Sequence, residues 1–386
     1  MTQQQWGGPP QWGQRRASQG RPGWGQQAPQ WGQSPWGQQQ SPYGNAQSPF
    51  GGQAPWGNQA LSRQQQGYGR QPYGRGPFPP PRRRHPLRSL FRALMFVVLL
   101  IVGGLVASNL LHPSSQADQP YQNDQYKVPP ADKTPPPLPV PETYTEARQL
   151  VLSNAFYDQT APVPVRCTAT PVNVATASDA KLKEHFESLM ECLVRVWEPP
   201  LSQAGFTIVR PTVTIYGREI TTRCGKSSVN AFYCSADQQV YFSNQLANYI
   251  PIVKTNKWAA DVVMAHEFGH ELQARSAILI SANALGQQTK DQAAELEMSR
   301  RIETQADCFS GMFTNAVSQD FGITRSDRAG IENTFAAVGD DEVSGKSTIV
   351  GNHGLARSRK YWNDIGLGTS SVGRCNTFRA SSSLVR

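Results

Sequence analysis

An uncharged run of 19 residues, Ala93–Leu111, constrains this chain more than any other feature of its sequence. An α-helix rises 1.5 Å per residue, so about 20 residues cross the hydrocarbon core of a bilayer. A buried helix of a soluble domain would normally carry polar residues on one face. The run is also longer than the apolar region of a typical signal peptide and lies far from the N-terminus. We therefore expect residues 93–111 to form one transmembrane helix.

Arginine side chains beside this run predict its orientation. Residues 82–92 form a basic juxtamembrane segment with five arginines, and no comparable basic cluster follows residue 111. The positive-inside rule then places the N-terminus in the cytoplasm and the C-terminal part outside. The same arginines should attract anionic lipid headgroups. The expected location is the cell membrane, with a single pass and the lipid bilayer as a partner.

The charge of the chain is divided unevenly. Residues 1–117 contain eleven arginines and no acidic residue, whereas residues 118–386 carry 26 basic and 28 acidic side chains. The high overall isoelectric point therefore describes the N-terminal part alone. A basic, nucleic-acid-binding fold is excluded for the rest, so we expect no nucleic-acid partner for the folded domain.

The remaining segments differ in composition. Residues 1–81 are rich in Gln, Gly, Pro and Trp and almost lack aliphatic side chains, so they predict a disordered cytoplasmic tail. Their aromatic-glycine pairs could mediate weak self-association or bind a partner or single-stranded nucleic acid. The alternative is a solvated tail without a specific partner. Residues 112–142 contain several prolines and predict an extended extracytoplasmic stalk. Residues 143–386 have ordinary composition and predict one folded domain.

The pattern within this domain predicts the α+β class. Apolar spacing and capping residues indicate helices over 143–157 and 178–197, the second ended by Pro199-Pro200. Runs of β-branched and aromatic residues indicate strands at 206–216 and 239–243. The pattern is helical from residue 249 almost to 339. Strands that look antiparallel are thus followed by helices.

One motif carries chemistry: His266-Glu267-Phe268-Gly269-His270, within an apolar helical pattern. Positions i and i+4 share one helix face, so His266 and His270 can bind one metal ion. Glu267 projects beside them and can take a proton from a metal-activated water. This arrangement is typical of a zinc hydrolase.

The spacing of residues alone does not identify the third metal ligand. Glu303 and Asp307 stand one helical turn apart on a later helix, so one can bind metal while the other receives a histidine N–H. Glu295 and Glu297 are rivals, although they suit a solvated helix face better. His353 is a less favoured candidate, because the continuation HxxGxxH of the metzincins is absent.

Several motifs together resemble the putative neutral zinc metallopeptidase family. They are HEFGH at 266–270, ETQADCFSG at 303–311, His353-Gly354, and CNTF at 375–378. The resemblance covers residues 143–386 and implies a zincin-like fold with a small sheet and one Zn²⁺ per domain. It implies Glu303 as third ligand, in a gluzincin-like set, and Asp307 as the carboxylate behind a ligand histidine.

His353 and the cysteines complete the candidate residues. His353 lies between two glycines, so it is either a donor to the oxyanion of the reaction or a loop residue, with Tyr241 as an alternative donor. Six cysteines allow fifteen pairings. Since an extracytoplasmic domain would hold disulfides, we expect the pairs Cys224–Cys234, Cys308–Cys375 and Cys167–Cys192.

The expected function is a membrane-anchored, extracytoplasmic zinc peptidase, a hydrolase that acts as an endopeptidase on peptide or protein substrates. Glu267 would be its general base and His353 a second catalytic residue. The alternative is a catalytically inactive surface or scaffold protein with a zincin fold. The sequence does not identify the substrate, the oligomeric state or a partner for the tail.

Overall fold

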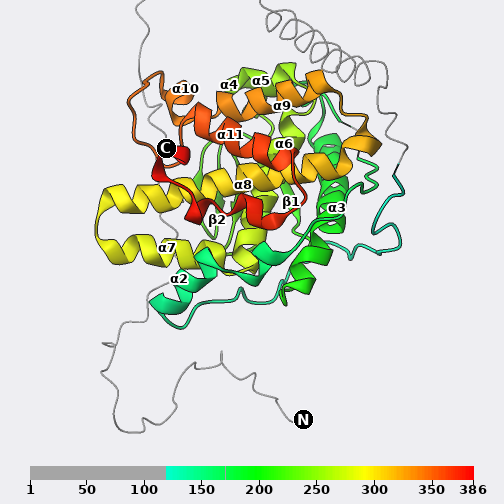
Figure 1. Cartoon of the computed structure of the whole chain (residues 1–386). Helices are drawn as coiled ribbons and strands as arrows, with labels where there is room; N and C mark the ends of the chain where they lie inside the picture. The colour runs from blue at the N-terminus through cyan, green and yellow to red at the C-terminus, as the bar shows by residue number, and fades with distance from the viewer. Residues whose placement is uncertain (1–118, 170) are drawn as a thin grey trace, which may run out of the picture.

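The computed structural model of the chain describes residues 119–169 and 171–386 (Figure 1). The predicted tail (1–81), basic segment (82–92) and transmembrane helix (93–111) lie outside these residues. Among the residues that are described, no helix is both long enough and apolar enough to cross a membrane.

The described part mixes many helices with few strands, as expected for the α+β class. The helices are α2 (Tyr144–Leu152), α3 (Asp179–Gln203), α4 (Leu246–Tyr249), α5 (Pro251–Thr255), α6 (Ala259–Arg275), α7 (Ile278–Thr289), α8 (Gln292–Phe321), α9 (Arg325–Ala337), α10 (Asp340–Ser344) and α11 (Ala356–Leu367). The strands are β1 (Val213–Tyr216), β2 (Ile220–Thr222), β3 (Gly225–Ser227), β4 (Ala231–Cys234) and β5 (Gln239–Ser243).

The strands form two small sheets rather than one antiparallel sheet. The larger has the order β1-β5-β4, with β5 parallel to β1 and antiparallel to β4. Strands β2 and β3 form a separate hairpin. The predicted strand 206–216 shrinks to β1, which begins after Pro211, a residue that cannot donate to a strand ladder. Strand β4 lies at an edge of its sheet, and this edge faces helix α6.

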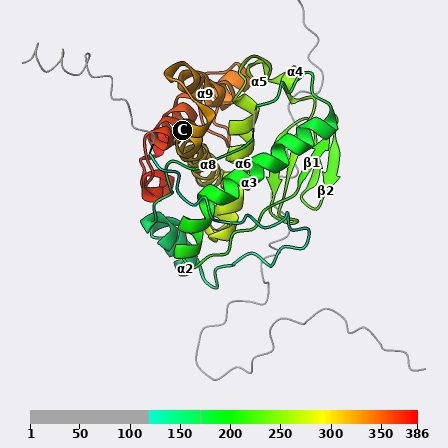
Figure 2. The ribbon, with the colours of Figure 1, turned by 90° about the vertical axis from the view of Figure 1, so that its right-hand side faces the viewer.

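Helix α8 is the centre of the helical part (Figure 1). It packs against α6, α7 and α11. In Figure 2 the strands lie on one side of the domain and the C-terminal segment on the other, with α6 and α8 between them. The core includes Phe156, Trp197 and Phe309, whose ring centroids are 5.4–6.0 Å apart in tilted and edge-to-face contacts.

Helix α3 does not end at Trp197, as its two prolines predicted, but continues to Gln203. A proline at position 199 cannot donate a hydrogen bond to the carbonyl group of Arg195. The side-chain amide of Asn123 donates to that carbonyl oxygen instead, at 2.7 Å. A residue 72 positions away thus satisfies the acceptor that the proline leaves open.

The described part of the predicted stalk, residues 119–142, lies against the domain. The carbonyl oxygen of Pro136 accepts hydrogen bonds from the side chains of Gln238 and Arg275. Tyr126, Val128 and Leu138 pack on the core. Proline-rich backbone has free carbonyl groups, and these side-chain donors hold the segment as a strap. Residues 119–142 thus pack as part of the described fold, through these hydrogen bonds and apolar contacts.

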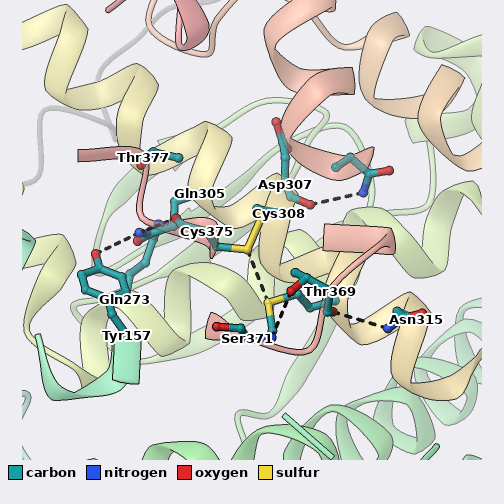
Figure 3. The surroundings of a disulfide bond; sticks show 12 residues. Tyr157, Gln273, Gln305, Asp307, Cys308, Asn315, Thr369, Ser371, Cys375 and Thr377 are labelled. Atoms are coloured by element: carbon teal, nitrogen blue, oxygen red, sulfur yellow. Dashed lines mark hydrogen bonds between the residues drawn. A yellow bond between two sulfur atoms is a disulfide. The ribbon is translucent and has the colours of Figure 1, made fainter. Parts of the chain in front are cut away.

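Three disulfide bonds are present, Cys167–Cys192, Cys224–Cys234 and Cys308–Cys375, the same pairs that the sequence analysis expects. Cys308 lies on α8, and its bond fastens the C-terminal segment to the middle of that helix (Figure 3).

Removal of the Cys308–Cys375 bond by Cys308→Ala/Cys375→Ala should lower the free energy of unfolding more than removal of Cys224–Cys234. The bonds join residues 67 and 10 positions apart. Loop entropy then gives losses of roughly 4 and roughly 3 kcal/mol. Denaturant unfolding of the purified variants measures both values, and a larger loss for Cys224→Ala/Cys234→Ala would contradict the expected order.

Candidate metal centre

Helices α6 and α8 bring three potential metal ligands together. His266 and His270 lie one turn apart on α6, with ring centroids 4.7 Å apart, and Glu303 faces both from α8. Nε2 of His266 is 3.3 Å from Glu303 Oε2, and Nε2 of His270 is 3.6 Å from Glu303 Oε1. One ligand atom from each residue lies within 4.8 Å of the others, so the group can hold a metal ion.

The glycine inside the HExxH motif permits this arrangement. A Cβ atom placed on Gly269 would lie 3.0 Å from the Cα atom of Ala306 on α8. Only glycine opposite a small residue lets the two helix backbones approach this closely. Gly269 lies between the two histidines in the sequence, and Glu303 lies one turn before Ala306 on α8. The close contact of Gly269 with Ala306 therefore places Glu303 against the two histidine rings.

Each histidine has an oxygen atom close to Nδ1, and its Nε2 faces Glu303. Nδ1 of His266 is 2.8 Å from the Asp307 carboxylate, and Nδ1 of His270 is 2.8 Å from the side-chain oxygen of Gln273. Such contacts fix the tautomer and ring orientation of metal-binding histidines. Two imidazole nitrogens and a carboxylate oxygen are a donor set that suits zinc, so the residues present fit that ion.

Two glutamines support His270, and the sequence analysis missed both. Gln273 donates to Gln305 Oε1 at 3.1 Å and to a carbonyl of α8, while Gln305 donates to the hydroxyl of Tyr157 at 2.9 Å (Figure 3). Gln273 follows His270 by three residues and so shares its helix face. That spacing is visible in the sequence, but the partner on α8 is not.

Burial and the neighbouring carboxylates shift the pKa values of the two histidines in opposite directions. Burial lowers the pKa of His270 to about 4. Burial also lowers the pKa of His266, but the contacts with the Asp307 and Glu303 carboxylates have a larger, opposite effect. The pKa of His266 is therefore raised to about 10. A metal ion must therefore displace a proton from His266, so its binding should weaken as the pH falls.

Glu267 is buried beside the three potential ligands and faces the sheet. Its Oε2 accepts a hydrogen bond of 3.0 Å from the backbone N–H of Tyr233 on edge strand β4. Burial raises the pKa of Glu267 to about 7, with a further contribution from the Glu303 carboxylate. A carboxylate with this pKa can accept and return a proton near neutral pH.

His353 lies near the centre in a loop that Asp340 holds. The Asp340 carboxylate accepts hydrogen bonds from the backbone N–H groups of His353 and Gly354, and its other oxygen is 3.4 Å from Nδ1 of His353. The His353 side chain is 44% exposed. Partial burial lowers its pKa, but the Glu303 and Asp340 carboxylates raise it overall. The three-residue metal-binding group does not include it.

The other candidates lie elsewhere. Glu295 is exposed, and Glu297 pairs with Arg301 at 2.7 Å on its own helix. Tyr241 donates its hydroxyl to Asp237. Asp307 has a further partner that the sequence analysis missed: Arg359 of α11 donates hydrogen bonds to both oxygens of its carboxylate.

Glu303→Gln should reduce bound metal far more than Glu297→Gln, because only Glu303 lies in the three-residue group. An amide is a much weaker ligand than a carboxylate for a hard or borderline cation. Elemental analysis after dialysis against zinc measures the metal content. Equal metal content in the two variants would contradict Glu303 as a ligand.

Comparison with known proteins identifies the family of this chain. A family model described as "Putative neutral zinc metallopeptidase" matches residues 154–378. The uncharacterized protein YpfJ of Escherichia coli (strain K12) is 30% identical over 194 residues, 48% of this chain and 67% of the relative. The uncharacterized protein Rv2575 of Mycobacterium tuberculosis (strain H37Rv) is 30% identical over 209 residues, with the same coverage. No solved structure gives a significant match. The chain belongs to the putative neutral zinc metallopeptidase family.

Proposed function

We propose that this chain is a zinc-dependent peptidase whose metal is bound by His266, His270 and Glu303. The observation that carries the proposal is a three-donor metal group with a buried carboxylate, Glu267, directly beside it. A structural zinc site usually has four protein ligands, whereas a catalytic site has three and an open position. Among the described residues, no fourth His, Cys, Asp or Glu joins the group.

When bound, zinc would polarise a peptide carbonyl group and lower the pKa of a water molecule to about 7. Glu267 takes the proton of the attacking water and returns it to the leaving amine. Its pKa of about 7 suits both transfers. The N–H of Tyr233 holds the Glu267 carboxylate, so the base stays oriented while the substrate binds.

Edge strand β4 supports a peptide as the substrate. Tyr233 directs its N–H away from β5 toward Glu267, so the unpaired edge of this strand lies beside the proposed base. An extended peptide can pair with such an edge through main-chain hydrogen bonds. A substrate strand bound there would present its carbonyl groups next to the metal centre.

His353 is the candidate for stabilising the oxyanion. Asp340 binds both the backbone and Nδ1 of this histidine, which orients the ring and leaves Nε2 free. The raised pKa favours the charged imidazolium, a stronger hydrogen-bond donor than neutral imidazole. Its partial exposure gives access to substrate.

Glu267→Gln tests the proposal, since glutamine keeps the size of the side chain and removes its basicity. Hydrolysis of a fluorogenic peptide library should fall by about 10²–10⁴-fold, the range for a general base, with zinc content unchanged. Full activity of Glu267→Gln would contradict the mechanism, and a zinc-loaded wild-type protein inactive on all peptides would favour the scaffold alternative.

His353→Ala should lower kcat by about 10²–10³-fold with little change in KM.

Membrane anchoring is a separate proposal that rests on the sequence of residues 82–111. All six native cysteines are paired in disulfides, so a single cysteine placed at Ser41 or Ser114 can be labelled selectively. A membrane-impermeant reagent should label Ser114→Cys and spare Ser41→Cys in intact cells. The reverse pattern would contradict the proposed orientation.

A further inference from the structure

Arg359 of α11 is a buried charged residue that makes several contacts beside the metal centre. Its Nε donates to Asp307 Oδ2 at 2.9 Å and its Nη2 to Asp307 Oδ1 at 2.7 Å. Both side chains are buried, with 5% and 0% of their surface exposed. Two parallel hydrogen bonds fix the plane of a carboxylate in a way that a lysine cannot reproduce.

The same guanidinium reaches the other carboxylate of the centre and the loop of His353. Nη2 lies 4.0 Å from Glu303 Oε2. Nη1 donates to the carbonyl oxygen of Val338 at 3.1 Å. The stem of Arg359 passes close to Gly354, next to His353. One buried cation therefore contacts two of the acidic residues of the centre, Asp307 and Glu303, and the segments that precede and follow α10.

A tight helix contact sets Arg359 in this position. A Cβ atom on Gly366 of α11 would lie 2.0 Å from the carbonyl oxygen of Cys308, and one on Gly311 of α8 would lie 2.3 Å from that of Asn363. The two backbones can touch only because both residues are glycine. Arg359 lies two turns before Gly366 on the same helix face, which sets it against Asp307, one turn before Gly311.

The buried charges make this arginine necessary. A buried carboxylate without a partner is costly, because it loses its hydration. Asp307 Oδ1 is shared between Arg359 and Nδ1 of His266, and Oδ2 is bound by Arg359. Without the guanidinium, the carboxylate would rotate or lose its charge, and the His266 ring would lose its fixed orientation.

We propose that Arg359 is a positioning residue that tightens zinc binding by holding Asp307 against His266. The inference rests on the proposed function, since it takes the bound ion to be zinc. We assign Arg359 no direct contact with the metal or the substrate. It acts through Asp307 on one ligand and through its charge on another, Glu303.

The test measures the dissociation constant of zinc for the full-length protein by competition with a chromogenic chelator. Arg359→Leu should raise it by about 10–100-fold, the range for losing a partner of a ligand histidine. Arg359→Lys should show a smaller rise, because lysine restores the charge without the paired hydrogen bonds. In an Asp307→Asn background, Arg359→Leu should add less than about threefold, because both residues act through one contact.

Arg301→Leu is the matched control. Arg301 is likewise buried, pairs with a glutamate and donates to backbone carbonyls, but it lies on α8 and faces the C-terminal segment. This variant should lose thermal stability and keep the zinc affinity of the wild type within about twofold. Should Arg359→Leu fail to fold, Arg359→Lys alone decides.

Wild-type zinc affinity in both Arg359 variants would overturn the positioning role while leaving the zinc peptidase intact. An equal loss of affinity in Arg301→Leu would also overturn it, since the effect would then be general destabilisation. A wild-type protein that binds no zinc would instead contradict the proposed function and this inference together. The three results are distinguishable in one titration series.

Discussion

The close approach of α6 and α8 at Gly269 and Ala306 is the constraint on which the rest of the structure depends. A methyl group at position 269 would lie 3.0 Å from the Ala306 backbone. Any larger separation would move Glu303 and Asp307 away from the two histidines together, because both carboxylates lie on α8. The metal-binding group and the contact that orients His266 therefore share one packing requirement.

Helix α8 carries this function because it is restrained on several sides. Gly311 lets α11 approach from one side, and the Cys308–Cys375 bond fastens the C-terminal segment beside it (Figure 3). Gln305 joins the same helix to Gln273 of α6. These restraints act within a few turns of Glu303, so the position of this side chain is fixed by packing and by a covalent bond as well.

Local patterns in the sequence pointed to the candidate residues of the centre, but they did not choose among them and did not reveal the residues that support them. His266 and His270, like Glu303 and Asp307, are four residues apart, so each pair shares one face of its helix. Gln305 and Arg359 contact the centre only through tertiary packing, which spacing does not reveal. The family resemblance, rather than spacing, favoured Glu303 over Asp307 as the ligand, and the structure brings Glu303 into the three-residue group.

The fold shows the same division between local and distant causes. The cap at Ser178 and the apolar face of α3 predicted where that helix begins. Its end was predicted wrongly, because Asn123 supplies a hydrogen bond from 72 residues away. The strap of residues 119–142 escaped prediction for a similar reason: its proline composition indicates an extended backbone but does not indicate which surface binds it. The parallel pairing of β1 with β5 also depends on long-range contacts.

A crystal structure of the zinc-loaded protein with anomalous data at the zinc edge tests the central claim most directly. We expect one zinc ion bound by Nε2 of His266, Nε2 of His270 and the Glu303 carboxylate, with the fourth position free of protein atoms. A fourth protein ligand such as His353, or a zinc ion bound elsewhere, would contradict it.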